Sequence, residues 1–520
     1  MLKDVLKTYG FLEEDFYFYG YNKAKLSIEK RKNKKGKLIL MTSINPTPYG
    51  EGKTTMSIGL TDALCSLEKK SIAVLREPSL GPVFGRKGGA CGGGESIIEP
   101  VNDINLHFTG DMHAITCANN LISAAIDNHL YYGNELEIDM DSIVFQRCID
   151  LNDRSLRDVE ISIKKDLKRK EHFVITAASE LMAVLCLSKD EEDLYRRIGN
   201  IYIAKNKRGE RLYVKDLHCI DAICILLKDA FLPNAVLTHE GNLSLVHGGP
   251  FANVAHGCSS YISLNLALTV ADYVITEAGF GSDLGGFKFV DLLTRQGMPL
   301  DLVVVNVTVR ALQYNGEGDL QKGISNLDFH LDNMKNLCSN VLVVLNQFDD
   351  DLEEDISYIE EYVTKKNIPF TISTSFKDGS KGAILFAQKV LASLENKSEI
   401  HYLYSLEESL QTKVEKVLHH LGASKIEYTE KAKQKIEEWK QTPYPICIAK
   451  TPMSISDDEK KLGYPKDYTV TVRDIKLCNG AEFIVVYLGN ILTLPGLTKD
   501  ARLYQMKIED YKKSNRRIIF

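Results

Sequence analysis

A glycine-rich loop near the N-terminus carries the residue types that hold a polyphosphate. The apolar run that starts at Leu38 ends in the sequence INPTPYGEGKTT, which leads into a segment typical of a helix. Gly50 and Gly52 let the backbone approach phosphate oxygens, and Lys53 is placed to reach the terminal phosphates. Thr54 would bind Mg2+ at the start of the helix. The segment therefore predicts a nucleotide triphosphate site.

One position of this loop departs from the usual phosphate-loop pattern. GxxxxGK[ST] begins with glycine, and this chain has Thr47 at that position. A glycine-rich turn that binds no ligand is therefore the alternative interpretation. The predicted nucleotide-binding residues are Thr47, Pro48, Gly50, Glu51, Gly52, Lys53, Thr54 and Thr55.

A second glycine-rich stretch follows the second expected strand. It covers 76–94 and holds seven glycines. That density suits a loop that wraps a ligand with backbone amides, and a flexible linker is the alternative. Arg76 and Glu77 stand at the carboxyl end of the expected strand 71–76, which is where ligands bind in open α/β sheets. We expect both side chains to take part in catalysis.

Histidines and one phenylalanine in other polar or glycine-rich segments are further candidate site residues. His247 and His256 flank turns rich in glycine and amide side chains, and we expect both to be catalytic. His107 and His113 do not share a helix face, so contacts with phosphate or carboxylate and a plain structural role both stay open. Phe280 stands between two glycines, where its ring could stack on a flat ligand or anchor the loop.

The elements that must position these residues alternate between strand and helix. Apolar runs at 37–44 and 71–76 are expected strands, with an expected helix at 54–67 between them. This order opens a βαβ unit and predicts a mostly parallel sheet. The β-branched runs at 302–309 and 340–346 are typical of further buried parallel strands.

The whole chain is predicted to be an α/β protein of the P-loop NTPase-like type, with helices on both faces of a mostly parallel sheet. A smaller α/β domain and a C-terminal strand-rich domain are expected to follow. The expected divisions are 1–325 for the nucleotide-binding domain, 326–443 for the smaller α/β domain and 444–520 for the strand-rich domain.

The composition and net charge of the chain limit the kinds of partner and the cellular compartment that we expect. A net charge of -6 over 520 residues gives no electrostatic case for binding nucleic acid. No apolar run approaches the roughly 20 residues of a membrane helix, and no signal peptide is expected, so we predict no membrane partner and a cytoplasmic location. The eleven cysteines include no CxxC pair, which fits reduced thiols in the cytosol.

A series of segments resembles one enzyme family, in the family's own order. The segments are TPYGEGKTT (47–55), REPSLGPVFG (76–85), INLHFTGDMHAI (104–115), DNHLYYGNEL (127–136), HGGPFANVAHGCSS (247–260), TEAGFGSDLG (276–285), TVRAL (308–312), CIAKTPMSISDDEKKLG (447–463) and LPGL (494–497). On these motifs the chain is identified as a member of the formate–tetrahydrofolate ligase family. Threonine at position 47 is normal in that family's version of the loop.

The resemblance implies a reaction and its participants. Family members use MgATP to phosphorylate formate, and N10 of tetrahydrofolate then attacks the formyl phosphate to give 10-formyltetrahydrofolate, ADP and phosphate. Arg76 matches the arginine that contacts the phosphate of formyl phosphate, and Glu77 matches the adjacent acid. Phe280 and Phe376 match the aromatic pair that sandwiches the pterin ring. The resemblance also implies that 1–325 binds formyl phosphate, that the protein is a homotetramer and that a monovalent cation stimulates it.

Nine positions depart from the family pattern, and we expect them at the ligand edge of the sheet. They are Arg86, Ile97, Phe287, Gln313, Asn315, Gln347, Phe376, Asp378 and Lys381, which replace an apolar residue, Gln, Glu, Lys, His, Arg, Trp, Lys and Glu, respectively. Two interpretations therefore stay open: a working ligase, and a paralogue that binds ATP but has altered or lost the folate or formate reaction. A scaffolding protein without ligand chemistry is a third, and it is hard to reconcile with both glycine-rich stretches.

Overall fold

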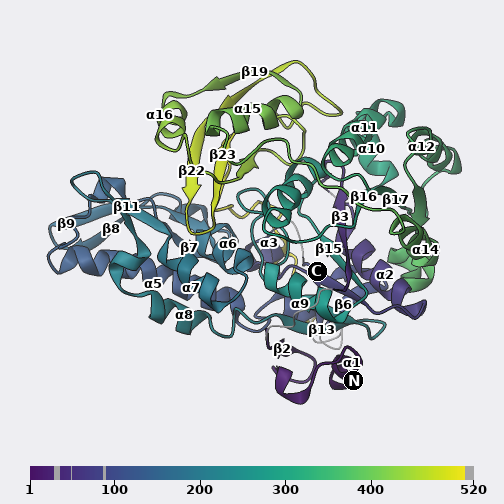
Figure 1. The fold of residues 1–520 in the computed structure, drawn as a ribbon, viewed down its shortest axis with the longest axis horizontal. Coiled ribbons are helices and arrows are strands. Elements are labelled where there is room, and N and C mark those ends of the chain that lie inside the picture. The colour runs from purple at the N-terminus through teal and green to yellow at the C-terminus, as the bar shows by residue number, and fades with distance from the viewer. Residues whose placement is uncertain (29–34, 49, 86–88, 510–520) are drawn as a thin grey trace.

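A large sheet, formed by twelve strands of the described chain, is the centre of the protein (Figure 1). The computed structural model describes residues 1–28, 35–48, 50–85 and 89–509. In spatial order the sheet contains β1 (Phe16–Phe18), β2 (Ala24–Leu26), β13 (Asn234–Thr238), β14 (Leu243–Val246), β4 (Ser71–Leu75), β15 (Tyr273–Glu277), β3 (Lys37–Ser43), β16 (Leu302–Val307), β17 (Val341–Asn346) and β18 (Phe370–Ser373), and β6 (Ser96–Glu99) joins β13 and carries β5 (Gly92–Gly93).

The strands from β14 to β18 all run parallel, which confirms the predicted mostly parallel sheet. The expected strands at 37–44, 71–76, 302–309 and 340–346 are β3, β4, β16 and β17. At the other end of the sheet β1, β2, β13 and β14 pair antiparallel, an arrangement that the sequence analysis did not predict.

Alternate residues of the parallel strands pack on opposite faces of the sheet, and helices cover both faces as predicted. Ile39 and Met41 of β3 pack in the cluster that contains α2 (Lys53–Ser66) and α14 (Ile384–Ser393). Leu38 and Leu40 pack in the larger cluster on the other face, which contains α9 (Tyr261–Val270) and α11 (Leu320–Leu337). The helix expected at 54–67 is α2, and it begins directly at the phosphate loop.

A lobe of helices and short strands extends from one end of the sheet (Figure 1). It contains α5 (Asp111–Tyr131), α6 (Glu180–Leu187), α7 (Glu191–Gly199), α8 (Ile220–Leu227), β7 (Arg147–Ile149), β8 (Val159–Lys164), β9 (Leu167–Glu171), β10 (Phe173–Ile175), β11 (Tyr202–Lys205) and β12 (Arg211–Tyr213). Further helices are α1 (Leu2–Thr8), α3 (Leu80–Phe84), α4 (Val101–Asn105), α10 (Val309–Asn315), α12 (Glu353–Lys365) and α13 (Ser375–Asp378).

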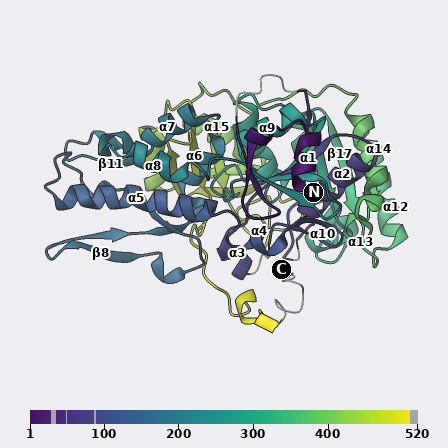
Figure 2. The ribbon, with the colours of Figure 1, turned by 90° about the horizontal axis from the view of Figure 1, so that it is seen from below.

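The C-terminal part packs small sheets and two helices above the lobe and the central sheet (Figure 1). It consists of α15 (Leu410–His420), β19 (Ala423–Tyr428), α16 (Glu430–Glu438), β20 (Ile446–Ala449), β21 (Tyr468–Val472), β22 (Asp474–Cys478) and β23 (Phe483–Tyr487). The chain then returns to α3, where the Arg502 N–H donates to the Gly85 carbonyl at 2.9 Å (Figure 2).

The two predicted domain boundaries stay predictions. The central sheet itself crosses residue 325, because β17 and β18 continue it beyond β16. Within the described residues, none of the helices combines the length and the apolar character that a membrane crossing requires.

Phe386 tests the packing of α14 on the sheet face that also carries α2. Its side chain is fully buried, so Phe386→Ala should lower the free energy of unfolding by about 3–5 kcal/mol through the cavity it leaves. Denaturant titration followed by circular dichroism measures the loss. Leu385→Ala, one residue away and 71% exposed, is the matched control and should change stability little. Equal losses in the two variants would contradict the packing described here.

Candidate active site

The carboxyl ends of the parallel strands meet at one edge of the sheet and bring distant residues together there. Ser43 ends β3, Arg76 follows β4, Glu277 ends β15, Thr308 follows β16 and Asn346 ends β17. Adjacent parallel strands end at the same edge, which is where open α/β sheets bind ligands. The phosphate loop leaves β3 at the middle of this edge.

Glu51 holds the phosphate loop in shape from inside. Its side chain is buried, with Oε1 accepting from the Thr47 N–H at 2.8 Å and Oε2 accepting from the Thr308 hydroxyl at 2.8 Å. The Glu51 carbonyl accepts from the Asn306 side chain at 2.6 Å. Pro48, in contrast, is exposed. These contacts direct the carboxylate of Glu51 into the protein, where it holds the shape of the loop.

Two glycines of the loop adopt backbone conformations that favour glycine. The φ angle is +80° at Gly50 and +72° at Gly52, both in the left-handed region. A Cβ at Gly52 would also lie 2.7 Å from Nδ2 of Asn346. Asn346 donates from the same nitrogen to the Glu51 carbonyl at 3.3 Å. The ends of β16 and β17 thus hold the loop close to the sheet.

Lys53 and Thr54 reach oxygen groups on two neighbouring strands. Lys53 Nζ donates to Ser43 Oγ at 3.0 Å, and the Thr54 hydroxyl donates to Oε2 of Glu277 at 2.7 Å. Burial lowers the pKa of Lys53, and the carboxylate of Glu277 opposes this shift. Thr55 is buried in the same helical turn.

Glu277 links the phosphate loop to Arg76. Strand β15 lies between β3 and β4, so its last residue lies between the segments that follow those two strands. Oε1 of Glu277 is 3.5 Å from a terminal nitrogen of Arg76. The sequence analysis did not single out Glu277, although it belongs to the quoted segment TEAGFGSDLG and ends a buried strand. The oxygens of Glu277 and Thr54 are of the kind that Mg2+ binds, so they fit the metal predicted at Thr54.

Arg76 and Glu77 differ in exposure and in surroundings. Arg76 keeps 24% of its side chain exposed, and its Nε is buried without a hydrogen-bond partner among the described residues. Glu77 is buried, and burial together with the negative charge of Asp111 raises its pKa well above the usual value. The Glu77 N–H donates to the Gly248 carbonyl at 2.7 Å. Arg76 therefore has donor capacity for an anion at this edge.

His247 is held by contacts within the protein, and its expected catalytic role stays a prediction. Its ring is fully buried, with Nδ1 2.6 Å from the Ser260 hydroxyl and Nε2 2.8 Å from the Ala230 carbonyl. Burial lowers its pKa to about 4. Both ring nitrogens are thus engaged within the protein, and the ring joins the end of β14 to the start of α9.

His256 is also fully buried but lies near Arg76. Neither ring nitrogen has a hydrogen-bond partner in the part of the chain that the structure describes. Burial and then the positive charge of Arg76 lower its pKa to about 3, so the ring is neutral. His256 is thus a neutral, fully buried imidazole near Arg76. His107 and His113 are both exposed, which leaves their role open.

The predicted aromatic residues each pack against a different phenylalanine. Phe376 is 48% exposed, and its ring centroid is 6.4 Å from that of Phe348. Phe280 contacts Phe251 with a centroid distance of 6.5 Å and has a φ of +62°, which is unusual for a bulky residue. The sequence analysis missed Phe348, although it directly follows Gln347. A pterin sandwich between Phe280 and Phe376 stays a prediction.

The second glycine-rich stretch has regular structure in its described parts, which include α3 and β5. Residues 86–88, among them Gly88, lie outside the described residues. A Cβ at Gly94 would collide with the carbonyl oxygen of Phe376. Close packing against α13 therefore requires glycine here, and the linker alternative does not explain this contact.

The positions that depart from the family pattern lie in different environments. Phe287 packs in the hydrophobic core, and buried Asn315 donates to a carbonyl of its own helix, so these are changes in packing. Gln347 follows β17 at the ligand edge, as expected, and Gln313 lies in α10 beside that edge. Ile97 is half-buried in β6.

Buried His247 predicts a loss of stability in acid. The unfolded imidazole binds a proton near pH 6.5, and the folded one binds it only near pH 4. The contribution of this group to the free energy of unfolding is therefore fully present above pH 6.5 and is lost as the pH falls from 6.5 to about 4. The loss from this group should approach about 3 kcal/mol. Unfolding titrations between pH 4 and 7 should therefore show a shallower decline for His247→Asn than for the parent. His113→Asn removes an exposed histidine and should keep the parent profile; an unchanged slope in His247→Asn would refute the assignment.

Comparison with known proteins gives one consistent result. The family model described as formate–tetrahydrofolate ligase matches residues 1–515. The formate–tetrahydrofolate ligase of Campylobacter concisus (strain 13826) is 48% identical, covering 98% of this chain and 96% of the relative. A relative with the same name in Caldicellulosiruptor saccharolyticus is 44% identical, covering 98% of this chain and 96% of the relative. Another in Petrotoga mobilis is 46% identical, covering 96% of this chain and 94% of the relative. Because these matches span nearly the whole chain, it belongs to the formate–tetrahydrofolate ligase family.

Proposed function

We propose that this chain makes 10-formyltetrahydrofolate from formate, tetrahydrofolate and ATP, with formyl phosphate as the intermediate, and so serves one-carbon metabolism. The observation that carries the proposal is the meeting of Lys53, Thr54 and Arg76 around Glu277 at the carboxyl edge of the sheet. The family membership supports it. The alternative, a paralogue that has lost the folate or formate reaction, finds no support in the comparisons.

The first step joins formate to the terminal phosphate of ATP. An oxygen of formate attacks the γ-phosphorus, and the bond from this phosphorus to ADP breaks. Lys53 would hold the terminal phosphates, and the amides of the phosphate loop would bind the oxygens beside them. Thr54 and Glu277 offer oxygens for Mg2+, which when bound neutralises charge on the phosphates.

Arg76 would hold the phosphate of formyl phosphate through both steps. Its buried Nε, without a partner among the described residues, supports this role. The raised pKa of Glu77 favours its protonated form, which donates a hydrogen bond where an ionised carboxylate would repel formate. Neutral His256 would be a hydrogen-bond partner beside Arg76. In the second step N10 of tetrahydrofolate attacks the carbonyl carbon, the C–O bond to phosphate breaks, and N10 loses its proton.

The aromatic surface of Phe348 and Phe376 is the site that we propose for the pterin ring. Arg310 connects this surface to the phosphate loop, because its terminal nitrogen donates to the Gly50 carbonyl at 2.8 Å. Its guanidinium carbon lies 4.2 Å from the centroid of the Phe348 ring. A pterin stacked there would therefore lie beside the phosphates from which the formyl group is transferred.

Other features of the proposal rest on the family resemblance alone. They are the homotetramer, stimulation by a monovalent cation, and the cytoplasmic location. The partners proposed for the chain are small molecules, namely ATP, formate and tetrahydrofolate.

Arg76→Ala tests the phosphate end of the site. Turnover should fall by about 10²–10³-fold because a group that binds charge in the transition state is lost, while the affinity for ATP changes much less. The assay mixes protein, MgATP, formate and tetrahydrofolate, and reads methenyltetrahydrofolate by its absorbance after acidification. Lys53→Ala should abolish product, and Lys69→Ala, an exposed lysine just after α2, is the matched control. Parent protein that makes no more product than Lys53→Ala would rule out the proposed reaction.

Phe376→Ala tests the folate end of the site. The KM for tetrahydrofolate should rise about tenfold, the value expected from losing one stacked ring, with the KM for ATP unchanged. Phe376→Trp should keep a stacking surface and a KM close to that of the parent. Phe280→Ala is measured in parallel, because the sandwich that the resemblance implies requires a rise in this KM from both variants, whereas an unchanged KM in Phe376→Ala would contradict the placement on Phe348 and Phe376.

A further inference from the structure

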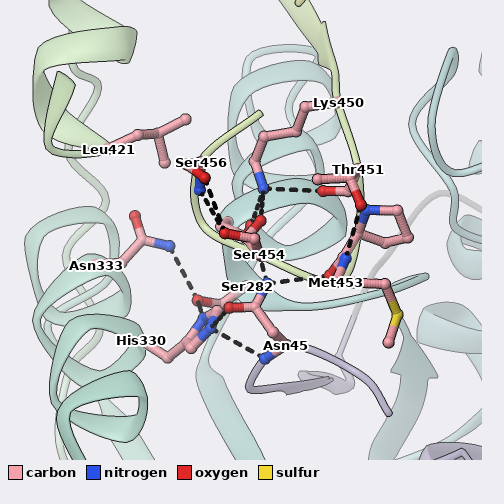
Figure 3. A network of polar contacts seen from close by, with 12 residues as sticks. Asn45, Ser282, His330, Asn333, Leu421, Lys450, Thr451, Met453, Ser454 and Ser456 are labelled. Atoms are coloured by element: carbon pink, nitrogen blue, oxygen red, sulfur yellow. Dashed lines mark hydrogen bonds and ion pairs between the residues drawn. The ribbon is translucent and has the colours of Figure 1, made fainter. Parts of the chain in front are cut away.

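A buried polar network lies directly behind the phosphate loop (Figure 3). Its centre is Asn45, just before the loop, which is bonded by segments far apart in the chain. The Asn45 N–H donates to Nε2 of His330 at 3.0 Å, and its Oδ1 accepts from Asn326 at 2.8 Å. Its Nδ2 donates to Oδ2 of Asp283 at 3.3 Å and to the Pro452 carbonyl at 3.1 Å. The backbone at the base of the loop is therefore held from three sides.

A buried ion pair joins this network to the C-terminal part. Lys450 directly follows β20, and its Nζ lies 2.5 Å from Oδ2 of Asp283. Both side chains are fully buried. Nζ also donates to the Ser454 carbonyl at 2.5 Å and to the Thr451 carbonyl at 3.3 Å, as Figure 3 shows. The ammonium group is therefore fixed by the segment that follows it, and its charge compensates that of the carboxylate.

The carboxylate of Asp283 also acts on Lys53. Burial lowers the pKa of Lys53, and the carboxylates of Glu277, Glu51 and Asp283 oppose this shift through their negative charge. Oδ1 of Asp283 is buried and has no hydrogen-bond partner among the described residues. Without Lys450, this carboxylate would be an uncompensated buried charge, and its charge acts on the buried ammonium groups of Lys53 and Lys288. Of these two, Lys53 is the group proposed to bind the nucleotide.

We propose that Lys450 is a positioning residue of the phosphate site, which neutralises Asp283 so that this carboxylate holds Asn45 and does not draw Lys53 away from the nucleotide. The inference rests on the proposed binding of ATP phosphates by Lys53. It makes the segment after β20 part of the nucleotide site although Lys450 acts only through other residues. It also explains why one buried carboxylate bonds both Lys450 and the base of the phosphate loop.

The test compares the affinities of four proteins for ATP and for AMP by titration calorimetry. AMP lacks the phosphates that Lys53 would reach, so it reports the site without this contact. Lys450→Met should weaken ATP binding at least about tenfold and leave AMP binding within about threefold, because Asp283 is then free to pair with Lys53. Asp283→Asn keeps an oxygen that can accept from Asn45 but removes the negative charge. Asp283→Asn and the Asp283→Asn/Lys450→Met double variant should therefore both bind ATP within about threefold of the parent.

Lys413→Met is the matched control for losing a buried lysine. Lys413 is fully buried and donates to the Thr442 and Tyr444 carbonyls at 3.0 and 3.1 Å in the C-terminal part. Its loss should leave the ratio of ATP to AMP affinity unchanged. The inference is overturned if Lys450→Met weakens ATP and AMP equally or not at all, if the double variant binds ATP no better than Lys450→Met, or if Lys413→Met shifts the ratio as much.

Two further comparisons keep the test decisive. If Lys450→Met does not fold, weak ATP binding by both Asp283→Asn and the double variant overturns the inference. Lys53→Met separates the inference from the proposed function. Unchanged ATP affinity in Lys53→Met would refute the role of Lys53 itself, whereas a loss in Lys53→Met without one in Lys450→Met would refute only the role of Lys450.

Discussion

The carboxylate of Glu277 lies between two cations, and the arrangement of the candidate site depends on this contact. Strand β15 lies between β3 and β4, so the residue that ends it is flanked by the phosphate loop and by Arg76. Glu277 accepts from Thr54 and pairs with Arg76, and its charge acts on Lys53. Like charges on Lys53 and Arg76 would otherwise repel each other in a partly buried place. One acidic group thus keeps the two cations near each other, as their proposed action on one phosphate requires.

The phosphate loop is held by polar groups on several sides of β3. On the side of β16 and β17, Thr308, Asn306 and Asn346 bond to Glu51 and so shape the loop. At its base, Asn45 is bonded by a network that reaches the C-terminal part. A loop with two residues in the left-handed region has few local hydrogen bonds of its own, so its shape depends on these outside partners. The shape of the proposed nucleotide site therefore depends on the whole sheet.

Hydrogen-bond partners, more than burial, distinguish the buried polar residues of the candidate site from one another. His247 and His256 are both fully buried, yet His247 has two internal partners, and neither ring nitrogen of His256 has one among the described residues. Buried polar groups are normally paired, and this difference separates the surroundings of the two rings. The same reasoning distinguishes Glu51, engaged on both oxygens, from Arg76, whose Nε has no partner in the described chain.

The sequence alone determined the local features of this protein. Glycines at 50 and 52, followed by Lys53, specify the loop, and continuous apolar or β-branched runs specify buried strands, because turn chemistry and burial pattern act over a few residues. The motifs also identified the family correctly.

Tertiary structure alone decided which side chains meet. Glu277 reaches Thr54, and Phe376 packs against Phe348, because strand order is set by crossover connections between segments that are remote in sequence. The structural contacts of His247 and the core position of Phe287 were equally hidden, since burial depends on everything that packs around a residue. Residue type and spacing carry the chemistry, and the order of strands in the sheet decides which groups perform it together.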